Sequence, residues 1–174
     1  MALIIEPGSP DADAYVDIDE VTEYFTRYSP DKATTWQGLQ VEIQEAAIRS
    51  ATKLLDYNVV WKGCPTHRDI QALQHPRVGL VDRMCEVFPD DEILPDLKTA
   101  TAELAYQLAT GGATGAPMMD DAFAPFKRMT IASNLSFELD DKSAPPAIPS
   151  YVMDLVAPWA IRAIGRNECQ LIRA

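Results

Sequence analysis

Apolar residues recur at helical spacing in three segments of the chain. The first begins after Asp17, which together with Glu20 forms the pattern of a capping box, and it is expected to end before Pro30. The second covers residues 39–57 and the third covers residues 96–109. Alanines are frequent in both long segments and would let two helices approach closely. We therefore expect these two helices to pack side by side as the core.

A shorter helix is predicted at residues 67–74. Thr66 and Asp69 give the pattern of an N-terminal cap at its start. Pro76 sets its end, because proline has no backbone donor and disfavours helical angles in the residue before it. We interpret Pro76 and the adjacent Arg77 as a structural corner of the fold.

One segment alternates between apolar and polar residues, which is the period of a β-strand. In residues 127–139 the apolar positions include Met129, Ile131, Leu135 and Phe137. A turn at residues 133–134 would make this segment a hairpin, and without that turn it would be one long strand. A ribbon of this kind needs helices or a neighbouring subunit to be stable.

Both ends of the chain are punctuated by prolines. The aliphatic stretch at residues 2–5 suits an edge strand or an arm that pairs with a neighbour, and the proline-rich residues 143–149 read as a linker. A last helix is expected over residues 151–164, with Pro158 causing a kink or an early end.

These elements predict a mainly α protein, a small helical bundle with a β-strand or hairpin near residues 127–139 and extended N- and C-terminal arms. We divide it into an N-terminal arm (1–16), a helical core domain (17–142) and a C-terminal docking segment (143–174).

Composition changes this picture chiefly through charge. The chain has a formal net charge of −11 and a sequence pI of about 4.5, whereas nucleic-acid binders usually present a basic surface to phosphate. A role on DNA would have to be indirect or local. The nearest basic and aromatic cluster consists of Lys62, Arg68 and Arg77 with Trp61. No signal peptide and no apolar run long enough for a bilayer is visible, so we expect a soluble, intracellular protein with no membrane partner.

Metal binding and catalysis find little support in the sequence. Cys64, His67, His75 and Cys85 lie within one region, but their spacing matches no zinc finger. We expect buried, reduced thiols and no metal or other cofactor. The chain has no glycine-flanked serine and no phosphate-binding glycine loop, and its paired aspartates lie in turn-like segments. We therefore expect that the protein is not an enzyme.

The order of the segments resembles a known family. "ALIIE", "AYVDIDEVTEYF", "EAAIRSATKLLDY", "QALQHPR", "ILPDLKTATAELAYQLA" and "FKRMTIASNLSFEL" follow one another as in the DnaT-like family of tailed-phage proteins. That family typically has tryptophan before the Pro-Arg pair, where this chain has His75. The resemblance covers nearly the whole chain.

Many members of that family look like head-tail connector or adaptor proteins of the virion. The resemblance then implies a structural ring, usually of twelve subunits, at the head-tail junction, assembled in the host cytoplasm. Its partners would be copies of itself, the portal protein and a tail-side neck, tail-terminator or tail-tube protein. An acidic channel would let genomic DNA slide through without specific binding.

In this connector hypothesis, two sets of residues form contacts between proteins. Portal-binding candidates in the C-terminal segment combine apolar and basic character: Trp159, Arg162, Arg166, Leu171, Ile172 and Arg173. Inter-subunit candidates come from the N-terminal arm and the alternating segment: Leu3, Ile4, Ile5, Met129, Ile131, Leu135 and Phe137.

Two other classes of protein remain open. One is a monomeric single-stranded DNA-binding replication protein. The other is a small hydrolase, which would need a pocket that joins His67 or His75 to distant carboxylates.

Overall fold

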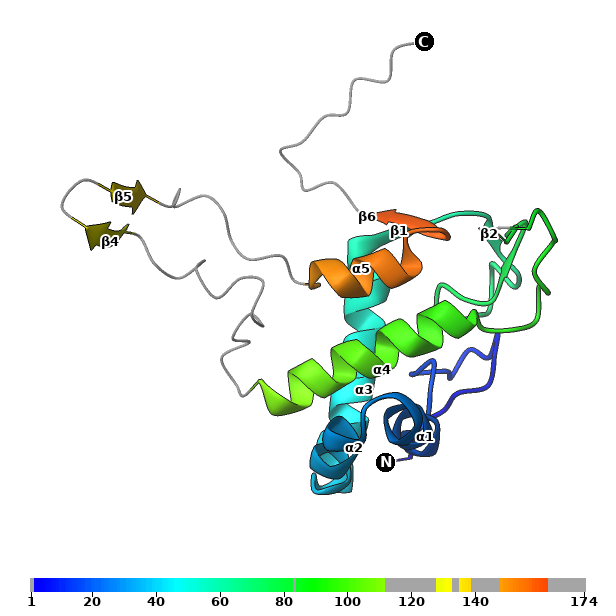
Figure 1. The fold of residues 1–174 in the computed structure, drawn as a ribbon. Coiled ribbons are helices and arrows are strands. Elements are labelled where there is room, and N and C mark those ends of the chain that lie inside the picture. The colour runs from blue at the N-terminus through cyan, green and yellow to red at the C-terminus, as the bar shows by residue number, and fades with distance from the viewer. Residues whose placement is uncertain (1, 83, 112–127, 133–134, 139–147, 163–174) are drawn as a thin grey trace, which may run out of the picture.

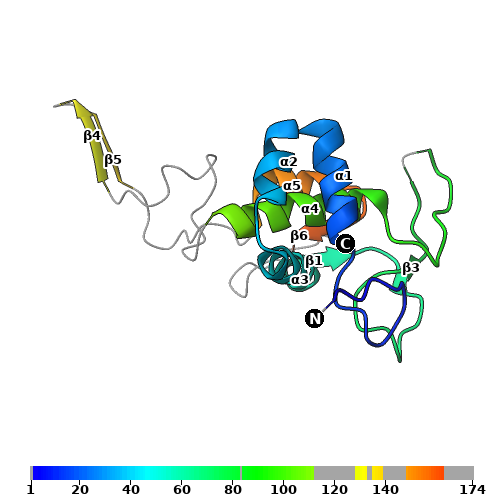
Figure 2. The same ribbon diagram turned by 90° about the horizontal axis from the view of Figure 1, so that it is seen from below.

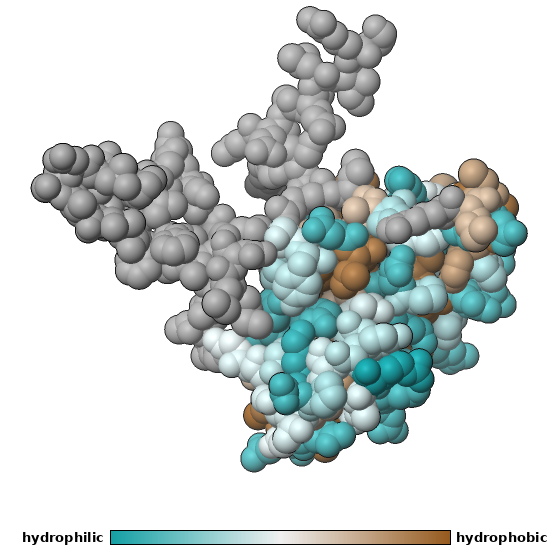
Figure 3. All heavy atoms as spheres, in the orientation of Figure 1, coloured by the Kyte–Doolittle hydropathy of each residue, from teal (hydrophilic) through white to brown (hydrophobic). Residues whose placement is uncertain are grey.

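The computed structural model describes residues 2–82, 84–111, 128–132, 135–138 and 148–162. Figure 3 shows one face of the molecule, where hydrophilic and hydrophobic residues are interspersed. Its helices are α1 (Ile18–Tyr28), α2 (Pro30–Gln37), α3 (Val41–Asn58), α4 (Pro95–Thr110) and α5 (Ser150–Val156). Its strands are β1 (Val59–Trp61), β2 (Cys64–Pro65), β3 (Arg77–Val78), β4 (Arg128–Ala132), β5 (Leu135–Glu138) and β6 (Ala160–Arg162). The prediction of a mainly α fold is confirmed.

The two long helices form the centre of the core, as the alanine-rich pattern predicts. Figure 1 shows α3 running upright with α4 and α5 crossing it, and Figure 2 shows the same layers from below. Ala51 and Leu55 of α3 and Ala100 and Leu104 of α4 are buried in one hydrophobic cluster. Packing between helices is thus the main source of stability, because none of the strands is longer than five residues.

Helix α1 begins as its sequence indicates. The Asp17 carboxylate accepts a hydrogen bond from the Glu20 backbone at 2.7 Å, and the Glu20 carboxylate accepts one from the Asp17 backbone at 3.3 Å. The sequence pattern does not predict α2, because Pro30 indicates only the end of α1. Proline also suits the first position of a helix, where its missing N–H has no partner to lose.

The last helix is shorter than residues 151–164. It ends at Val156, and the chain turns at Pro158 and returns as β6, which pairs antiparallel with β1. Pro158 therefore marks an early end. Ile148, Val152 and Val156 are buried in the same cluster as the long helices, so this part of the chain packs on the core.

The alternating segment is a hairpin. Strands β4 and β5 pair antiparallel, with Met129 opposite Phe137 and an irregularity between Thr130 and Ala132. This agrees with the predicted strand or hairpin near residues 127–139. The turn expected at residues 133–134 lies outside the described residues.

Two predicted elements are absent from the described residues. Residues 2–5 form no strand, because the Ile4 carbonyl accepts hydrogen bonds from Asp13 and Ala14 of the same arm. Residues 67–74 form a single turn in place of a helix. The His67 carbonyl accepts from Gln71 at 3.0 Å, but the next amide, that of Ala72, donates to Ser9. The N-terminal arm thus takes the donor that would have continued the helix.

Candidate nucleic-acid interface

Most lysines and arginines of the helical body are neutralised by carboxylates. Ion pairs join Arg27 to Glu23, Lys32 to Glu103, Arg49 to Asp13 and Glu45, and Lys98 to Glu20. The charge of these cations is already balanced by a carboxylate of the same chain. A phosphate backbone needs cations whose nearest partner is not a carboxylate.

Three exposed cations meet this requirement among the residues whose side chains the structure describes. Lys53, Lys62 and Arg68 are exposed and have no carboxylate within ion-pair distance there. Lys62 Nζ donates to the Pro158 carbonyl at 2.8 Å, and an Arg68 N–H donates to Cys64 Sγ at 3.3 Å. We call these three residues together with Tyr57 the basic surface.

The local charge supports this choice. Residues 46–81 carry five cations and two acids, whereas the rest of the chain carries ten cations and 24 acids. Two of the five are not available to a ligand, because Arg49 is paired with carboxylates and Arg77 is buried. The overall acidity therefore conceals one stretch of opposite sign. A single strand drawn to this stretch would be repelled by the surfaces around it, which restricts where it can lie.

Tyr57 supplies the aromatic group of the basic surface. Its side chain is 83% exposed, and it follows Lys53 by four residues on α3, so the two share one helix face. An exposed ring can stack on any unpaired base. Sequence reasoning missed Tyr57; its position outside the apolar stripe of the second long helix was the available signal.

Arg77 shapes the loop that carries two cations of the basic surface, Lys62 and Arg68. It is 7% exposed, and its guanidinium donates to the carbonyls of Lys62 and Gly63, both at 2.8 Å, and of Gln74 at 3.0 Å. Burial lowers its pKa. Gly63 has φ +68° and lies so close to the Val78 carbonyl that a Cβ would stand 2.3 Å from it, so only glycine fits there.

A buried polar cluster ties this loop to α3. Asp56 accepts hydrogen bonds from the Tyr15 hydroxyl at 2.6 Å and from the Gln74 backbone at 3.2 Å. Burial raises the pKa of the Asp56 carboxyl to about 6, although both hydrogen bonds and Arg77 oppose this shift. These contacts hold the end of α3, next to Tyr57, against the loop at Gln74.

His75 fills the space beneath the same loop. The peptide bond between His75 and Pro76 is cis, and the imidazole packs edge-on against Trp61, with ring centroids 4.5 Å apart. Burial, and then the charge of Arg77, lower its pKa to about 3. Neither ring nitrogen has a hydrogen-bond partner among the described residues. His75 is thus a neutral core residue.

The cluster predicted from sequence therefore divides in two. Trp61 is 7% exposed and Arg77 is turned toward carbonyls, so neither is placed to contact DNA. Lys62 and Arg68 are exposed and remain candidates. Residue type alone could not separate these two roles, because burial decides them.

The expectations for the cysteines and for the metal cluster also change. Cys64 and Cys85 are exposed, so the prediction of buried thiols was wrong for both. His75 is buried while Cys64 and His67 are exposed. No group of three or more potential metal ligands occurs among the residues described by the structure. In the same part of the chain, no helix is long and apolar enough to cross a membrane.

The candidates for portal binding differ in burial, and some of them lie outside the described residues. Trp159 is buried, and its indole N–H donates to the Asp96 carboxylate at 2.8 Å. Arg162 lies in β6 opposite Val59. The remaining candidates for portal binding lie outside the described residues: Arg166, Leu171, Ile172 and Arg173.

The inter-subunit candidates of the N-terminal arm face their own chain. Leu3, Ile4 and Ile5 are half-buried, and Leu3 and Ile5 pack against the hydrophobic core. Of the others, Met129 and Ile131 lie in β4 and Leu135 and Phe137 in β5, where the structure describes the backbone pairing alone.

The fold is that of a small, mainly α domain, and its exposed cations without a carboxylate partner among the described residues lie on α3 and on the loop that follows it. The chain matches the family model "Putative DnaT-like ssDNA binding protein" over residues 1–173, and it therefore belongs to that family. No curated protein and no solved structure matches the chain.

This family membership overturns the connector hypothesis. The family is described by single-stranded DNA binding, so the assignment as a dodecameric head-tail ring was wrong. The partners inferred with it, namely ring neighbours, the portal protein and tail-side proteins, fall with it, as does passage of DNA without binding. The error came from averaging charge over the whole chain, since the net value of −11 hides the cationic stretch at residues 46–81.

Proposed function

We propose that the protein binds single-stranded DNA and catalyses no reaction on it. The observation that carries this proposal is the family match over residues 1–173. The basic surface supports it from the geometry, because it combines cations that have no carboxylate partner in the described structure with an exposed aromatic ring.

In this proposal, Lys53, Lys62 and Arg68 contact phosphates while Tyr57 stacks on an unpaired base. Both contacts are indifferent to sequence, because every nucleotide has a phosphate and every base has a flat face. Duplex DNA offers phosphates but keeps its bases stacked inside. Tyr57 is therefore the residue that should make binding to single-stranded DNA tighter than binding to the duplex.

The test is fluorescence anisotropy with a labelled oligonucleotide of about 30 nucleotides, single-stranded or annealed to its complement. We expect the single strand to bind more tightly than the duplex. Tyr57→Ala should weaken single-strand binding about tenfold, and Tyr57→Phe, which keeps the ring, should leave it near the wild-type value. Equal affinity of the wild-type protein for both forms, or retention of neither at low salt, would refute the proposal.

A further inference from the structure

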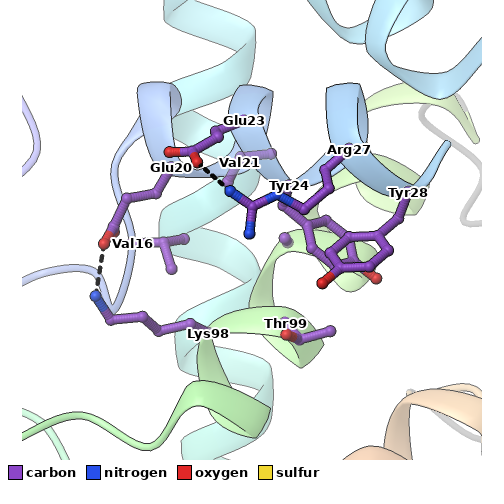
Figure 4. A pocket seen from close by; sticks show the side chains of 10 residues that line it. Val16, Glu20, Val21, Glu23, Tyr24, Arg27, Tyr28, Lys98 and Thr99 are labelled. Carbon is purple, nitrogen blue, oxygen red and sulfur yellow. Dashed lines mark hydrogen bonds and ion pairs between the residues drawn. The ribbon is translucent and has the colours of Figure 1, made fainter. Parts of the chain in front are cut away.

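A second surface with aromatic and charged groups lies between α1 and α4. It is a hollow of about 200 Å³, and its polar and aromatic lining consists of Glu20, Glu23, Tyr24, Arg27, Tyr28 and Lys98 with Thr99. Figure 4 shows Arg27 and Lys98 each joined to a glutamate of α1, with the two tyrosine rings beside Arg27. The hollow shares no residue with the basic surface.

One wall of the hollow is a pair of tyrosine rings. The centroids of Tyr24 and Tyr28 are 5.3 Å apart. Tyr24 is held in place because its hydroxyl donates to Glu103 at 3.1 Å, and Lys32 donates to the same carboxylate at 2.7 Å. Tyr28 is 66% exposed. The wall thus has one fixed ring and one ring that offers its surface to a ligand.

The charges around these rings are paired with one another, but weakly. Arg27 lies 2.7 Å from Glu23, and both side chains are more than 60% exposed. Lys98 lies 2.5 Å from Glu20, and both are about 40% exposed. Exposed ion pairs contribute little to stability and exchange partners readily. A ligand that offers both an anion and hydrogen-bond donors could therefore replace both pairs.

An unpaired nucleotide offers these groups together. Its phosphate can accept from Arg27 or Lys98, and its base can stack on Tyr28. The carboxylates released from the ion pairs are acceptors only, so they suit a base with an exocyclic amino group, as in cytosine or adenine. Thymine offers only its ring N3–H, and the carbonyl oxygens on both sides of it repel a carboxylate, so thymine suits these acceptors less well.

We propose that the hollow between α1 and α4 binds an unpaired nucleobase that carries an amino group, stacked on Tyr28 with its amino group donating to Glu23. This inference rests on the proposed function. It adds a preference for base type that the basic surface cannot supply, and it places a second contact point on α1.

The test compares binding of oligocytidine and oligothymidine deoxynucleotides of equal length, about 12 nucleotides, to the wild-type protein. We expect the cytosine strand to bind several-fold more tightly. Tyr28→Ala should weaken its binding about tenfold, whereas Tyr28→Phe should not. Because Tyr28 is exposed, both variants should keep the fold, which a thermal melt would verify.

A third variant isolates the base preference. Glu23→Ala removes both a negative charge and the acceptor of the amino group, so it should raise affinity for the thymine strand, give the cytosine strand no comparable gain, and abolish the ratio between them. A wild-type ratio near one, or an unchanged ratio in Glu23→Ala, would overturn the hollow as the site while single-strand binding stands. Failure of the wild-type protein to bind either strand would overturn both proposals.

Discussion

The Tyr15 hydroxyl donates a 2.6 Å hydrogen bond to the Asp56 carboxylate across 41 residues of sequence. Asp56 also accepts from the Gln74 backbone, so one carboxylate joins the N-terminal segment, the end of α3 and the loop before β3. The basic surface is carried by two of these three segments. Its geometry therefore depends on a buried carboxylate, and the first prediction concerns the charge of that group.

Asp56→Asn should change how stability depends on pH. The pKa of Asp56 is raised from 3.8 to about 6 in the folded state, so the stabilising contribution of this group is present below pH 4 and is lost as pH rises through 6. Asparagine has no such titration. Relative to the wild-type protein, the free energy of unfolding of the variant should gain up to about 3 kcal/mol between pH 4 and pH 7. Urea unfolding at both pH values measures it, and a constant difference would contradict it.

His75→Phe should act in the opposite pH range. The pKa of His75 is lowered from 6.5 to about 3, so its contribution is complete above pH 6.5 and is lost as pH falls toward 3. Phenylalanine removes this loss and also removes two buried nitrogens without partners. We expect the variant to be more stable by about 1 kcal/mol at neutral pH, with a larger advantage near pH 4.5. A melting temperature that falls with pH equally in both proteins would speak against this role.

Arg77→Ala should destabilise the fold strongly. It would leave the carbonyls of Lys62, Gly63 and Gln74 without their charged donor, at a cost of about 3 kcal/mol or more. Arg77→Lys should recover only part of this, because an ammonium cannot reach several carbonyls in a fork. The matched control is Arg27→Ala, which removes an exposed ion pair with Glu23. It should lower the free energy of unfolding by less than about 1 kcal/mol. Similar losses for both arginines in denaturant unfolding would refute the structural role.

The salt dependence of single-strand binding should be steeper the more cations of the basic surface contact phosphates. Three phosphate contacts at the basic surface contribute about −2 to the slope of log affinity against log salt concentration. Lys62→Ala with Arg68→Ala should reduce this contribution to about −0.7. The charge-retaining exchange, Lys62→Arg with Arg68→Lys, should leave it unchanged. A slope that ignores the alanine substitutions would place the phosphate contacts elsewhere on the chain.

The sequence predicted those parts of the fold that depend on local spacing. The cap at Asp17 and Glu20 and the stripes of α3 and α4 are set by neighbours within a few residues, so their pattern is visible in one dimension. The prediction of a helix at residues 67–74 was wrong, because the helix is ended by a hydrogen bond from the Ala72 amide to the Ser9 carbonyl, and Ser9 is distant in sequence. Helix α2 was not predicted, because a proline can both end one helix and begin the next.

The candidate site was harder to predict, because its members differ in exposure more than in type. Arg68 and Arg77 are the same residue, yet one is exposed and the other is turned toward the backbone. Trp61 and Tyr57 are both aromatic, and the one chosen from sequence is the buried one. The net charge led to the wrong class of protein for a similar reason, since a sum over the chain does not say which carboxylates pair with which cations.

The way Arg77 holds its loop has a consequence for how the protein opens. Segments 61–63 and 74 are bridged by one guanidinium, and the strands that accompany it, β2 and β3, have only two residues each. When this side chain leaves, it releases the carbonyls of all these segments together. The backbone amides of this loop should therefore exchange their hydrogens with solvent with one common free energy of opening, as a unit that closes or opens as a whole.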